Sequence, residues 1–397
     1  MTRSHSRLAR INQWTENARL ERLHLLRRET DASLTQLATP LEDPSELRGQ
    51  IENYVGVVRM PVGVAGPLAV CGEDAVGTYY VPLATTEGTL VLAVTRGAEV
   101  ITSAGGASVH ASDSQVTRAP LFVFPTGVLA RAAGRWVIEN FGAIRAQAEA
   151  TTRHGQLLWI EPITAGRRLV LEFTFRTGDA AGQNMVTFAA DAACCWLRGQ
   201  PLFSRVEFYT LESNLSHDKK IANLTQAHRR GRQVNAEVTI PRAEVVRRFR
   251  ADPQAIARVA LEGAYSSILS GAVGAQAQFA NVLAALFVAT GQDVATVTES
   301  GTGLTVIEET AAGDLYASVT IPNLLVGSVG GGTRLPSQRE CLDLIGCAQS
   351  GSARKLAEIA GAAVLAGELA LVAALASDTF AQAHAAYGRP RKTGTAA

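Results

Sequence analysis

The chain has 397 residues, a formal net charge of +1 and 47% hydrophobic residues. This length is sufficient for two or three domains with large cores, and the near-neutral charge excludes a broad electrostatic attraction to nucleic acid or membranes. The cysteines form no CxxC pair and have no metal-binding spacing, which indicates buried thiols in a reducing cytoplasm and no metal site. They are Cys71, Cys194, Cys195, Cys341 and Cys347. The N-terminus lacks the apolar run of a secretory signal.

The amino-acid composition and the hydrophobic pattern, together called the texture here, change several times along the chain. Residues 1–50 are rich in arginine and have helical spacing before Pro40 and Pro44, which predicts a short helical N-terminal segment. Residues 51–120 mix short strands with an Ala-rich helix near 90–101, and a similar texture returns after Asp218. Between these regions, residues 121–208 alternate strand-like runs such as RLVLEFTF with helical runs such as NMVTFAADAACCWL. This alternation predicts a compact α+β module.

The C-terminal part is predicted to contain long helices from about residue 354 to 387. The apolar stretch LAEIAGAAVLAGELALVAALA is interrupted by Glu358 and Glu368, so we expect a buried or interface helix and not a membrane span. We expect the tail, residues 391–397, to be disordered.

Lysine is rare in this chain, and two of the four lysines are adjacent. The chain has 37 basic residues, but its lysines are only Lys219, Lys220, Lys355 and Lys392. An ammonium group differs from a guanidinium group because it can give up its proton in a suitable environment. A lysine pair is also common on solvated loops, so the pair alone leaves both interpretations open.

Three further ionisable residues stand in unusual surroundings. Glu87 lies among small and apolar residues in PLATTEGTLVLAV, where a carboxyl group is either paired or protonated. Asp293 follows an apolar helical pattern and a glycine, and His384 lies near the end of the last predicted helix. A helix cap for Asp293 and a satisfied structural histidine are the alternatives. There is no GxSxG, HExxH or Walker A motif, so the sequence does not support the corresponding hydrolases and NTPases.

Two glycine-rich stretches are candidate phosphate-binding loops. They are TGDAAGQNM, residues 177–185, and GSVGGGTRLP, residues 327–336. A turn before a helix can direct backbone N–H groups at a phosphate, although such turns are also common without a ligand. Neither stretch is a GxGxxG motif, so a Rossmann domain is not supported.

Taken together, the motifs resemble those of one family. ENYVGVVRMPVGVAGPL, PLATTEGTLVLAVTRGAEVI, DAAGQNM, DKK, GQD and VGSVGGGTRLPSQRECLDLIG occur in the order seen in 3-hydroxy-3-methylglutaryl-CoA (HMG-CoA) reductases. The chain most resembles the soluble catalytic part of the eukaryote-like class, without its membrane anchor, over roughly residues 50–390.

The resemblance implies a fold, a reaction and an assembly. It implies a large substrate-binding domain (51–120 and 209–390) with an inserted small α+β domain (121–208), ferredoxin-like and non-Rossmann, that binds NADP. The implied enzyme is a cytoplasmic oxidoreductase of the mevalonate pathway that uses NADPH and an acyl-CoA substrate. It is expected to be a homodimer or homotetramer with active sites between subunits.

The resemblance also implies roles for individual residues. The implied catalytic residues are Glu87, Lys219, Asp293 and His384. The implied cofactor-binding residues are Arg153, Asp179, Gly182, Gln183 and Asn184. The implied substrate-binding residues are Glu52, Arg96, Arg118, Asn214, Asp218, Lys220 and Asn281. No metal is expected.

The reduction of a thioester to an alcohol explains these residue types. Two hydrides are needed, and each builds negative charge on a carbonyl oxygen that the Lys219 ammonium would stabilise. Glu87 and Asp293 would tune the lysine and pass protons, and His384 would protonate the departing CoA thiolate. Arg153 would contact the 2′-phosphate that distinguishes NADPH from NADH.

Several substrate-side positions depart from the family pattern. The family holds the HMG carboxylate with a lysine, but this chain has none between Lys220 and Lys355, and the aligned position is about Leu261. Arg258, one helical turn earlier, is a candidate substitute. Glu212 stands in place of a substrate-contacting serine, and Gln278 replaces a histidine. A like charge near an anionic ligand costs several kcal/mol when buried. A reductase of another acyl thioester, on CoA or a carrier protein, and a non-catalytic CoA- or nucleotide-binding protein are therefore the alternatives.

Overall fold

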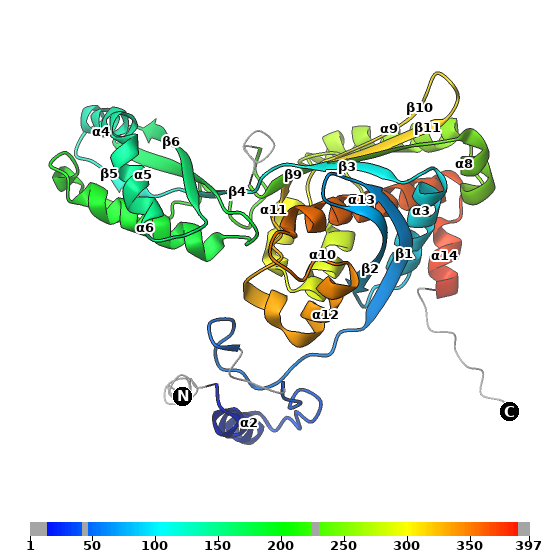
Figure 1. Cartoon of the computed structure of the whole chain (residues 1–397), viewed down its shortest axis with the longest axis horizontal. Helices are drawn as coiled ribbons and strands as arrows, with labels where there is room; N and C mark the ends of the chain where they lie inside the picture. Colours follow the sequence, from blue (N-terminus) through cyan, green and yellow to red (C-terminus); the bar gives the residue numbers. More distant parts are fainter. Residues whose placement is uncertain (1–13, 42–46, 224–229, 388–397) are drawn as a thin grey trace. The chain divides into compact units, whose positions relative to one another are not determined.

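The computed structural model describes residues 14–41, 47–223 and 230–387 (Figure 1). The chain divides into two units, residues 1–62 and 63–397. The first unit contains helix α2 (Glu16–Thr30), which begins after Thr15 because the threonine hydroxyl accepts a hydrogen bond from the backbone N–H of Ala18 at 3.3 Å. A helix was expected in this segment. The predicted tail, 391–397, lies outside the described residues.

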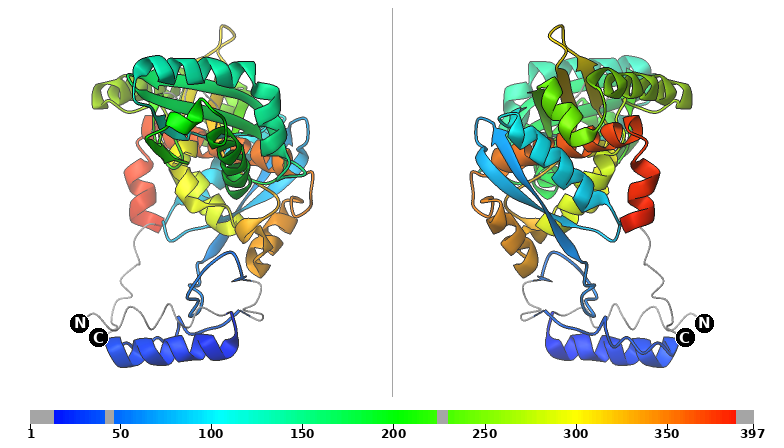
Figure 2. Two further views of the ribbon diagram at one scale, coloured as in Figure 1. Left: turned by 90° about the vertical axis from the view of Figure 1, so that its left-hand side faces the viewer. Right: turned by 90° about the vertical axis from the view of Figure 1, so that its right-hand side faces the viewer.

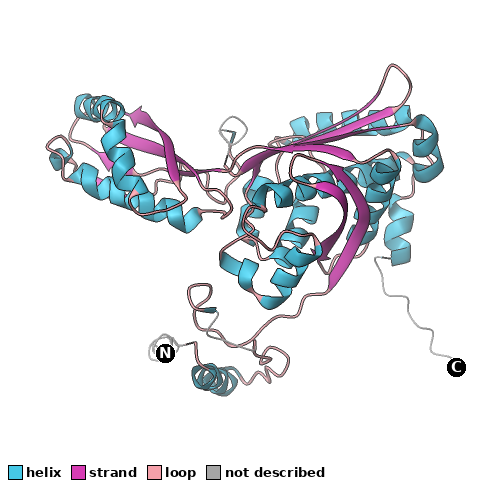
Figure 3. Ribbon diagram, in the orientation of Figure 1, coloured by secondary structure: helices cyan, strands magenta, loops and turns pink. Residues whose placement is uncertain are grey.

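The unit 63–397 is built around two β-sheets, which Figure 3 shows in magenta. The first sheet has six strands in the order β10-β11-β9-β3-β1-β2. Strand β1 pairs in parallel with β3, whereas β3–β9, β9–β11 and β10–β11 are antiparallel. The β10–β11 hairpin projects from the rest of the sheet (Figure 2). The strands are β1 (Val62–Cys71), β2 (Val76–Ala84), β3 (Ala107–Ala111), β9 (Arg232–Ile240), β10 (Leu304–Glu309) and β11 (Leu315–Leu324).

Helices cover this first sheet. The long helix α13 (Ala353–Ala376) packs against β3, β9 and β11 and against helix α3 (Leu90–Ser103). Helix α13 is long and apolar enough to cross a membrane, but 78% of its most apolar window is buried inside the protein. The expectation of a buried helix is thus confirmed. The other helices around this sheet are α8 (Arg242–Phe249), α9 (Pro253–Ser270), α10 (Phe279–Thr290), α11 (Val297–Ser300), α12 (Pro336–Leu344) and α14 (Phe380–Tyr387).

The second sheet has five strands and a hydrophobic core of its own. Strand β7 is central: β4 and β5 pair with successive parts of one edge, β6 pairs with the other edge, and β8 pairs with β5, all antiparallel. The strands are β4 (Gln115–Arg118), β5 (Leu121–Val123), β6 (Gln156–Ala165), β7 (Arg168–Arg176) and β8 (Phe208–Thr210). Strand β4 lies before residue 121, so the second sheet begins earlier in the chain than the texture suggested.

Three helices accompany the second sheet: α4 (Gly127–Glu139), α5 (Phe141–Glu149) and α6 (Gln183–Arg198). They contribute apolar residues to the same core as Phe122 and Phe173; α4, for example, contributes Ala130, Ala133 and Val137, at intervals of three and four residues. This helical spacing of small and branched residues is what an amphipathic helix on a sheet requires. The mixed α+β class predicted from the sequence is confirmed.

Candidate active site

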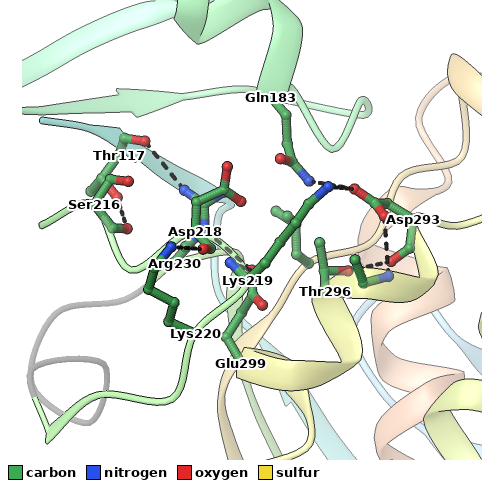
Figure 4. A network of polar contacts seen from close by, with 12 residues as sticks. Thr117, Gln183, Ser216, Asp218, Lys219, Lys220, Arg230, Asp293, Thr296 and Glu299 are labelled. Carbon is green, nitrogen blue, oxygen red and sulfur yellow. Dashed lines mark hydrogen bonds and ion pairs between the residues drawn. The ribbon is translucent and has the colours of Figure 1, made fainter. Parts of the chain in front are cut away.

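Lys219 and Asp293 meet as an ion pair. The Lys219 Nζ lies 2.9 Å from Asp293 Oδ2, and the two side chains are 44% and 39% exposed (Figure 4). An ion pair that is exposed to this degree contributes little to stability. What the pair does is fix where the ammonium group points, and Lys219 is the only lysine among the described residues with a carboxylate partner within 4.0 Å.

The way helix α10 ends determines the position of Asp293. The helix stops at Gly291, whose φ of 69° is the left-handed conformation that glycine adopts readily. A Cβ at this position would lie 2.3 Å from the Gly332 carbonyl oxygen, so the GQD turn packs tightly on the second glycine-rich loop. Asp293 then caps the 3-10 helix η3 (Val294–Thr296) by accepting from the N–H of Ala295 at 3.1 Å. The helix-cap alternative and the pairing with Lys219 therefore both hold, because the two carboxylate oxygens serve different partners.

A network of arginines and carboxylates lies next to this pair (Figure 4). Asp218 accepts from Arg230 Nη2 at 2.5 Å and from Arg118 Nη1 at 3.2 Å. Arg230 also pairs with Glu299 at 3.3 Å, and both of these side chains are 1% exposed or less. Burial raises the pKa of Glu299, although the charge of Arg230 opposes this shift.

The turn that carries these residues has an uncommon backbone conformation. Asn214, His217 and Lys219 have φ angles of 69°, 60° and 57°. Residues other than glycine rarely adopt positive φ, and such conformations are retained where the surrounding structure holds them, often at functional sites. Three such residues within six positions indicate that the surrounding structure holds this turn in a strained conformation.

The start of helix α6 reaches the Lys219–Asp293 pair. The side-chain Nε2 of Gln183 donates to Asp293 Oδ2 at 3.1 Å, and the backbone carbonyl oxygen of Gln183 accepts from Arg118 Nη2 at 3.3 Å. Gly182, with φ 81°, precedes the helix, which has no side-chain cap. The first N–H groups of α6 therefore remain available for an anion.

The other predicted cofactor residues surround this helix start. Asn184 is exposed in its first turn. Arg153 is exposed in the loop after α5, and that loop packs closely on α6, since a Cβ at Gly155 would lie 2.8 Å from Met185 Cε. Asp179 differs, because its carboxylate accepts hydrogen bonds from the N–H of Gly351 at 2.8 Å and from the Ser350 hydroxyl at 3.2 Å. In this structure Asp179 thus ties the loop to the start of α13.

Glu87 and Asn281 form a second, separate pair. Asn281 Nδ2 donates to Glu87 Oε1 at 3.3 Å, and Glu87 is exposed. Glu87 precedes α3, and Asn281 lies in the first turn of α10. The structure therefore brings together two of the predicted residues, but it joins Glu87 to Asn281 and not to Lys219.

His384 is not brought to the Lys219–Asp293 pair. It is exposed on α14, where its Nδ1 lies 3.0 Å from the Phe380 carbonyl oxygen and its ring contacts the Phe380 ring. Helix α14 lies beyond α13, away from α6 (Figure 1).

The remaining predicted substrate residues have varied surroundings. Arg96 is engaged within the protein, because its guanidinium donates to the carbonyl oxygens of Arg248 and Phe249 at 3.1 and 3.3 Å. Lys220 Nζ donates to the Asp218 carbonyl oxygen at 2.9 Å, and Asn214 lies in the strained turn. Glu52 is exposed in the unit 1–62.

The positions that depart from the family pattern can also be located. Glu212 Oε2 lies 3.7 Å from Arg118 Nη1, so a carboxylate of the chain itself stands beside that arginine. Arg258 pairs with Glu262 at 2.5 Å on the exposed side of α9, close to the exposed Leu261. Gln278 Nε2 donates to the Gly367 carbonyl oxygen of α13.

Sequence reasoning missed Arg230 and Glu299. Arg230 belongs to the run HRRGR, which resembles a solvated basic loop, yet its side chain is 1% exposed. Glu299 follows the GQD motif within VTES, where its neighbours Thr298 and Ser300 are polar, so the local sequence carried no signal of its burial. In residues 14–41, 47–223 and 230–387 there is no group of three or more His, Cys, Asp or Glu side chains that could hold a metal ion.

Comparison with known proteins identifies relatives of the chain. A family model described as hydroxymethylglutaryl-coenzyme A reductase matches residues 18–389. The chain is 45% identical over 355 residues to the 3-hydroxy-3-methylglutaryl-coenzyme A reductase of Pyrococcus horikoshii, covering 87% of this chain and 86% of that protein. It is 37% identical over 350 residues to the reductase of the same name from Strongylocentrotus purpuratus, covering 85% of this chain and 37% of that protein.

A solved structure agrees with these matches at the level of the fold. The class II 3-hydroxy-3-methylglutaryl-CoA reductase from Streptococcus pneumoniae, bound to NADPH in open conformations, has a TM-score of 0.66 and 20% identity, covering 91% of this chain and 86% of that chain. The family that the motifs indicated is therefore confirmed: the chain belongs to the hydroxymethylglutaryl-coenzyme A reductase family.

Proposed function

We propose that this protein catalyses the NADPH-dependent reduction of HMG-CoA to mevalonate and free CoA. The reaction consumes two NADPH and two protons, because the thioester carbonyl takes up two hydrides and the C–S bond is broken between them. One observation carries the proposal: Asp293 Oδ2 contacts both Lys219 Nζ, at 2.9 Å, and Gln183 Nε2, at 3.1 Å. The predicted oxyanion donor thus lies beside the helix start at which the nucleotide is predicted to bind.

Lys219 has the central role in this mechanism. Its ammonium group donates a hydrogen bond to the thioester oxygen, which becomes negatively charged as the carbonyl carbon is reduced. Asp293 holds the ammonium group in place. Glu87, with Asn281, supplies a proton on the substrate side, and His384 protonates the departing thiolate. The role of His384 rests on the C-terminal motif, since the ring contact and the hydrogen bond of His384 are both with Phe380 of its own helix.

The residues at the start of α6 fit an anionic nucleotide. The N–H groups of this helix have no side-chain cap, and a Cβ placed at Gly178, Gly330 or Gly331 would meet no atom within 4 Å, which leaves the glycine-rich loops open to a ligand. NADPH supplies the hydride when bound. Gly182, Gln183 and Asn184 would hold its phosphates, and Arg153 its 2′-phosphate.

We propose that residues 121–208, together with the flanking strand β4 and the end of β8, form the inserted NADP-binding domain. The large domain would then be made of the rest of 51–120 and 209–390. The element order β5, α4–α5, β6, β7, α6, β8 is the βαββαβ pattern of ferredoxin-like folds, which supports this assignment. The 37% identity to the reductase from Strongylocentrotus purpuratus supports the eukaryote-like class. All five cysteines are free thiols, in agreement with a cytoplasmic location.

We further propose a homodimer or homotetramer. Helix α9 carries Leu261, Tyr265, Ile268 and Leu269 with 45%, 52%, 73% and 88% of their surfaces exposed. Large apolar side chains gathered on one helix are typical of an interaction surface.

A second candidate substrate is an acyl thioester without the distal carboxylate of HMG. Arg118 already has two carboxylates beside it, Asp218 at 3.2 Å and Glu212 at 3.7 Å. A further carboxylate would have to displace one of them or add a third negative charge.

NADPH oxidation with a panel of acyl-CoA substrates tests both candidates. We expect turnover with HMG-CoA, and a preference for an acyl-CoA that lacks the second carboxylate would favour the other candidate. NADPH binding without oxidation of any substrate in the panel would contradict a reductase and indicate a binding protein.

A further inference from the structure

The helical segment formed by η3 and α11 contacts both the side-chain ammonium group and the backbone of Lys219. Asp293, at the start of η3, pairs with the Lys219 Nζ at 2.9 Å. Glu299, in helix α11 immediately after η3, accepts a hydrogen bond from the Lys219 backbone N–H at 3.3 Å (Figure 4). The lysine is therefore held at its side chain and at its backbone by two carboxylates of the same segment.

Glu299 is itself anchored by an ion pair with Arg230. Glu299 Oε1 accepts from both the Lys219 N–H and the Arg230 Nε, each at 3.3 Å. Arg230 extends the contact, because its Nη2 donates to Asp218 Oδ1 at 2.5 Å and its Nη1 to the Thr117 carbonyl oxygen at 3.2 Å. The pair Arg230–Glu299 thus connects to Asp218 and Lys219, two successive residues of the turn.

Burial of the Arg230–Glu299 ion pair costs desolvation free energy, so stability alone does not explain the pair. Glu299 is fully buried, and its Oε2 has no hydrogen-bond partner within the described part of the chain. Replacing a buried ion pair by apolar residues is often neutral or stabilising, so burial of the pair is weak evidence for a stability role. Lys219, moreover, has φ 57°, a conformation that needs support from its surroundings.

We propose that Glu299, anchored by Arg230, is a positioning residue that holds the Lys219 turn in its left-handed conformation, so that the ammonium group meets Asp293 at the position of the developing oxyanion. This inference rests on the proposed function of Lys219. Glu299 is fully buried and acts through the lysine, without a contact of its own to substrate or cofactor. A displacement of about 1 Å at a reacting centre can reduce turnover about 100-fold, so the position of the turn matters for rate.

The test variant is Glu299→Asp, which keeps the charge for Arg230 but withdraws the carboxylate from Lys219 by one methylene group. We expect kcat per folded molecule to fall about 10- to 100-fold, with the Kd for NADPH within about twofold of wild type. Amide hydrogen exchange in the peptide that contains Lys219 should become faster, because its N–H loses its acceptor. Glu299→Gln keeps the side-chain shape but removes the charge that Arg230 anchors. It should therefore show a smaller loss than Glu299→Asp in both measurements, still distinct from wild type, and it serves as the test if the aspartate variant does not fold.

The matched control is Glu358→Asp. Glu358 is also fully buried, but its carboxylate accepts from the N–H groups of Glu73, Asp74 and Ala75 in the turn after β1, at 3.1, 3.0 and 2.6 Å. We expect this variant to lose stability, as Glu299→Asp does, while kcat per folded molecule and exchange at Lys219 stay unchanged.

The possible outcomes distinguish failure of the positioning role of Glu299 from failure of the proposed reductase function. Wild-type kcat and exchange in folded Glu299→Asp, or in folded Glu299→Gln if the aspartate variant does not fold, would overturn the positioning role, as would an equal loss of kcat in Glu358→Asp. If wild type reduces no acyl-CoA, the proposed function fails, and the exchange rate at Lys219 then decides alone: faster exchange in the Glu299 variant supports the positioning role, and unchanged exchange overturns it.

Discussion

At the scale of single residues, Lys219 and Lys220 differ in what holds their ammonium groups. Lys219 Nζ pairs with the Asp293 carboxylate at 2.9 Å, whereas Lys220 Nζ donates to a backbone carbonyl oxygen at 2.9 Å. Lys219→Arg keeps the charge but changes its geometry and removes an easily donated proton. We expect kcat to fall by about two to three orders of magnitude, as for loss of one oxyanion donor, in an assay of NADPH oxidation at saturating substrate.

Lys220→Arg is the matched control, and its loss should be milder, because another cation can partly replace a lysine that only orients an anionic substrate. Near-normal turnover in both variants would require the catalytic assignment to be rebuilt around Glu87 and His384.

Arg153 is the residue predicted to select NADPH. It is exposed in a loop that packs against Met185, one residue after Asn184 at the start of α6. Arg153→Ala should weaken NADPH binding by about 1.5–3 kcal/mol, the range for a hydrogen bond to a charged group, and should leave NADH binding nearly unchanged. Fluorescence titration measures both constants, with the exposed Arg135 of α4, replaced by alanine, as the control. An equal loss for both cofactors would show that Arg153 does not read the 2′-phosphate.

At the scale of elements, helices α3 and α13 cross with almost no space between their backbones. A Cβ at Gly97 of α3 would lie 2.0 Å from the Ala366 carbonyl oxygen of α13. Gly97→Ala should therefore force the helices apart and reduce the free energy of unfolding by about 1–3 kcal/mol or more. Gly142→Ala in α5, where no atom lies within 4 Å, should change it by less than about 1 kcal/mol. Urea unfolding of both variants provides the comparison, and equal stability would contradict the close crossing.

At the scale of the whole molecule, the exposed apolar side of α9 predicts assembly. Ile268 and Leu269 are 73% and 88% exposed. An aspartate at either position would place a charge in a buried interface, so Leu269→Asp should shift the protein to a monomer in light scattering and lower its activity if the sites lie between subunits. Val128→Asp, at a 66% exposed position of α4, is the control and should leave assembly unchanged. A fully active wild-type monomer would refute the proposal.

The buried Glu368 of α13 predicts a pH dependence of stability. Burial raises its pKa from 4.5, against the opposing effect of its hydrogen bonds with Thr305, Ala277 and Gln278. The folded state therefore binds this proton more tightly than the unfolded state, and its contribution to stability is present at or below pH 4.5 and is lost as the pH rises through the folded pKa. Relative to Glu368→Gln, wild type should lose stability between pH 4.5 and the folded pKa in urea titrations. A pH-independent difference between the two proteins would contradict the raised pKa.

The sequence by itself determined the family, the type of chemistry and several of the helices and strands. DKK, GQD and TTEG occur in family order, and hydrophobic periodicity predicted α3, α6 and α13. These features are local, because a motif needs only its neighbouring letters and a helix needs only its own repeat.

Contacts between distant parts of the chain were decided only by the tertiary structure. Folding pairs Lys219 with Asp293 and joins the Asp179 carboxylate by a hydrogen bond to the backbone just before α13. It pairs Glu87 with Asn281 instead of with the lysine. It also buries Arg230 and Glu299 beneath the Lys219 turn. A buried arginine and a solvated one are written with the same letter, and their difference arises only when the sheets and loops around them have closed.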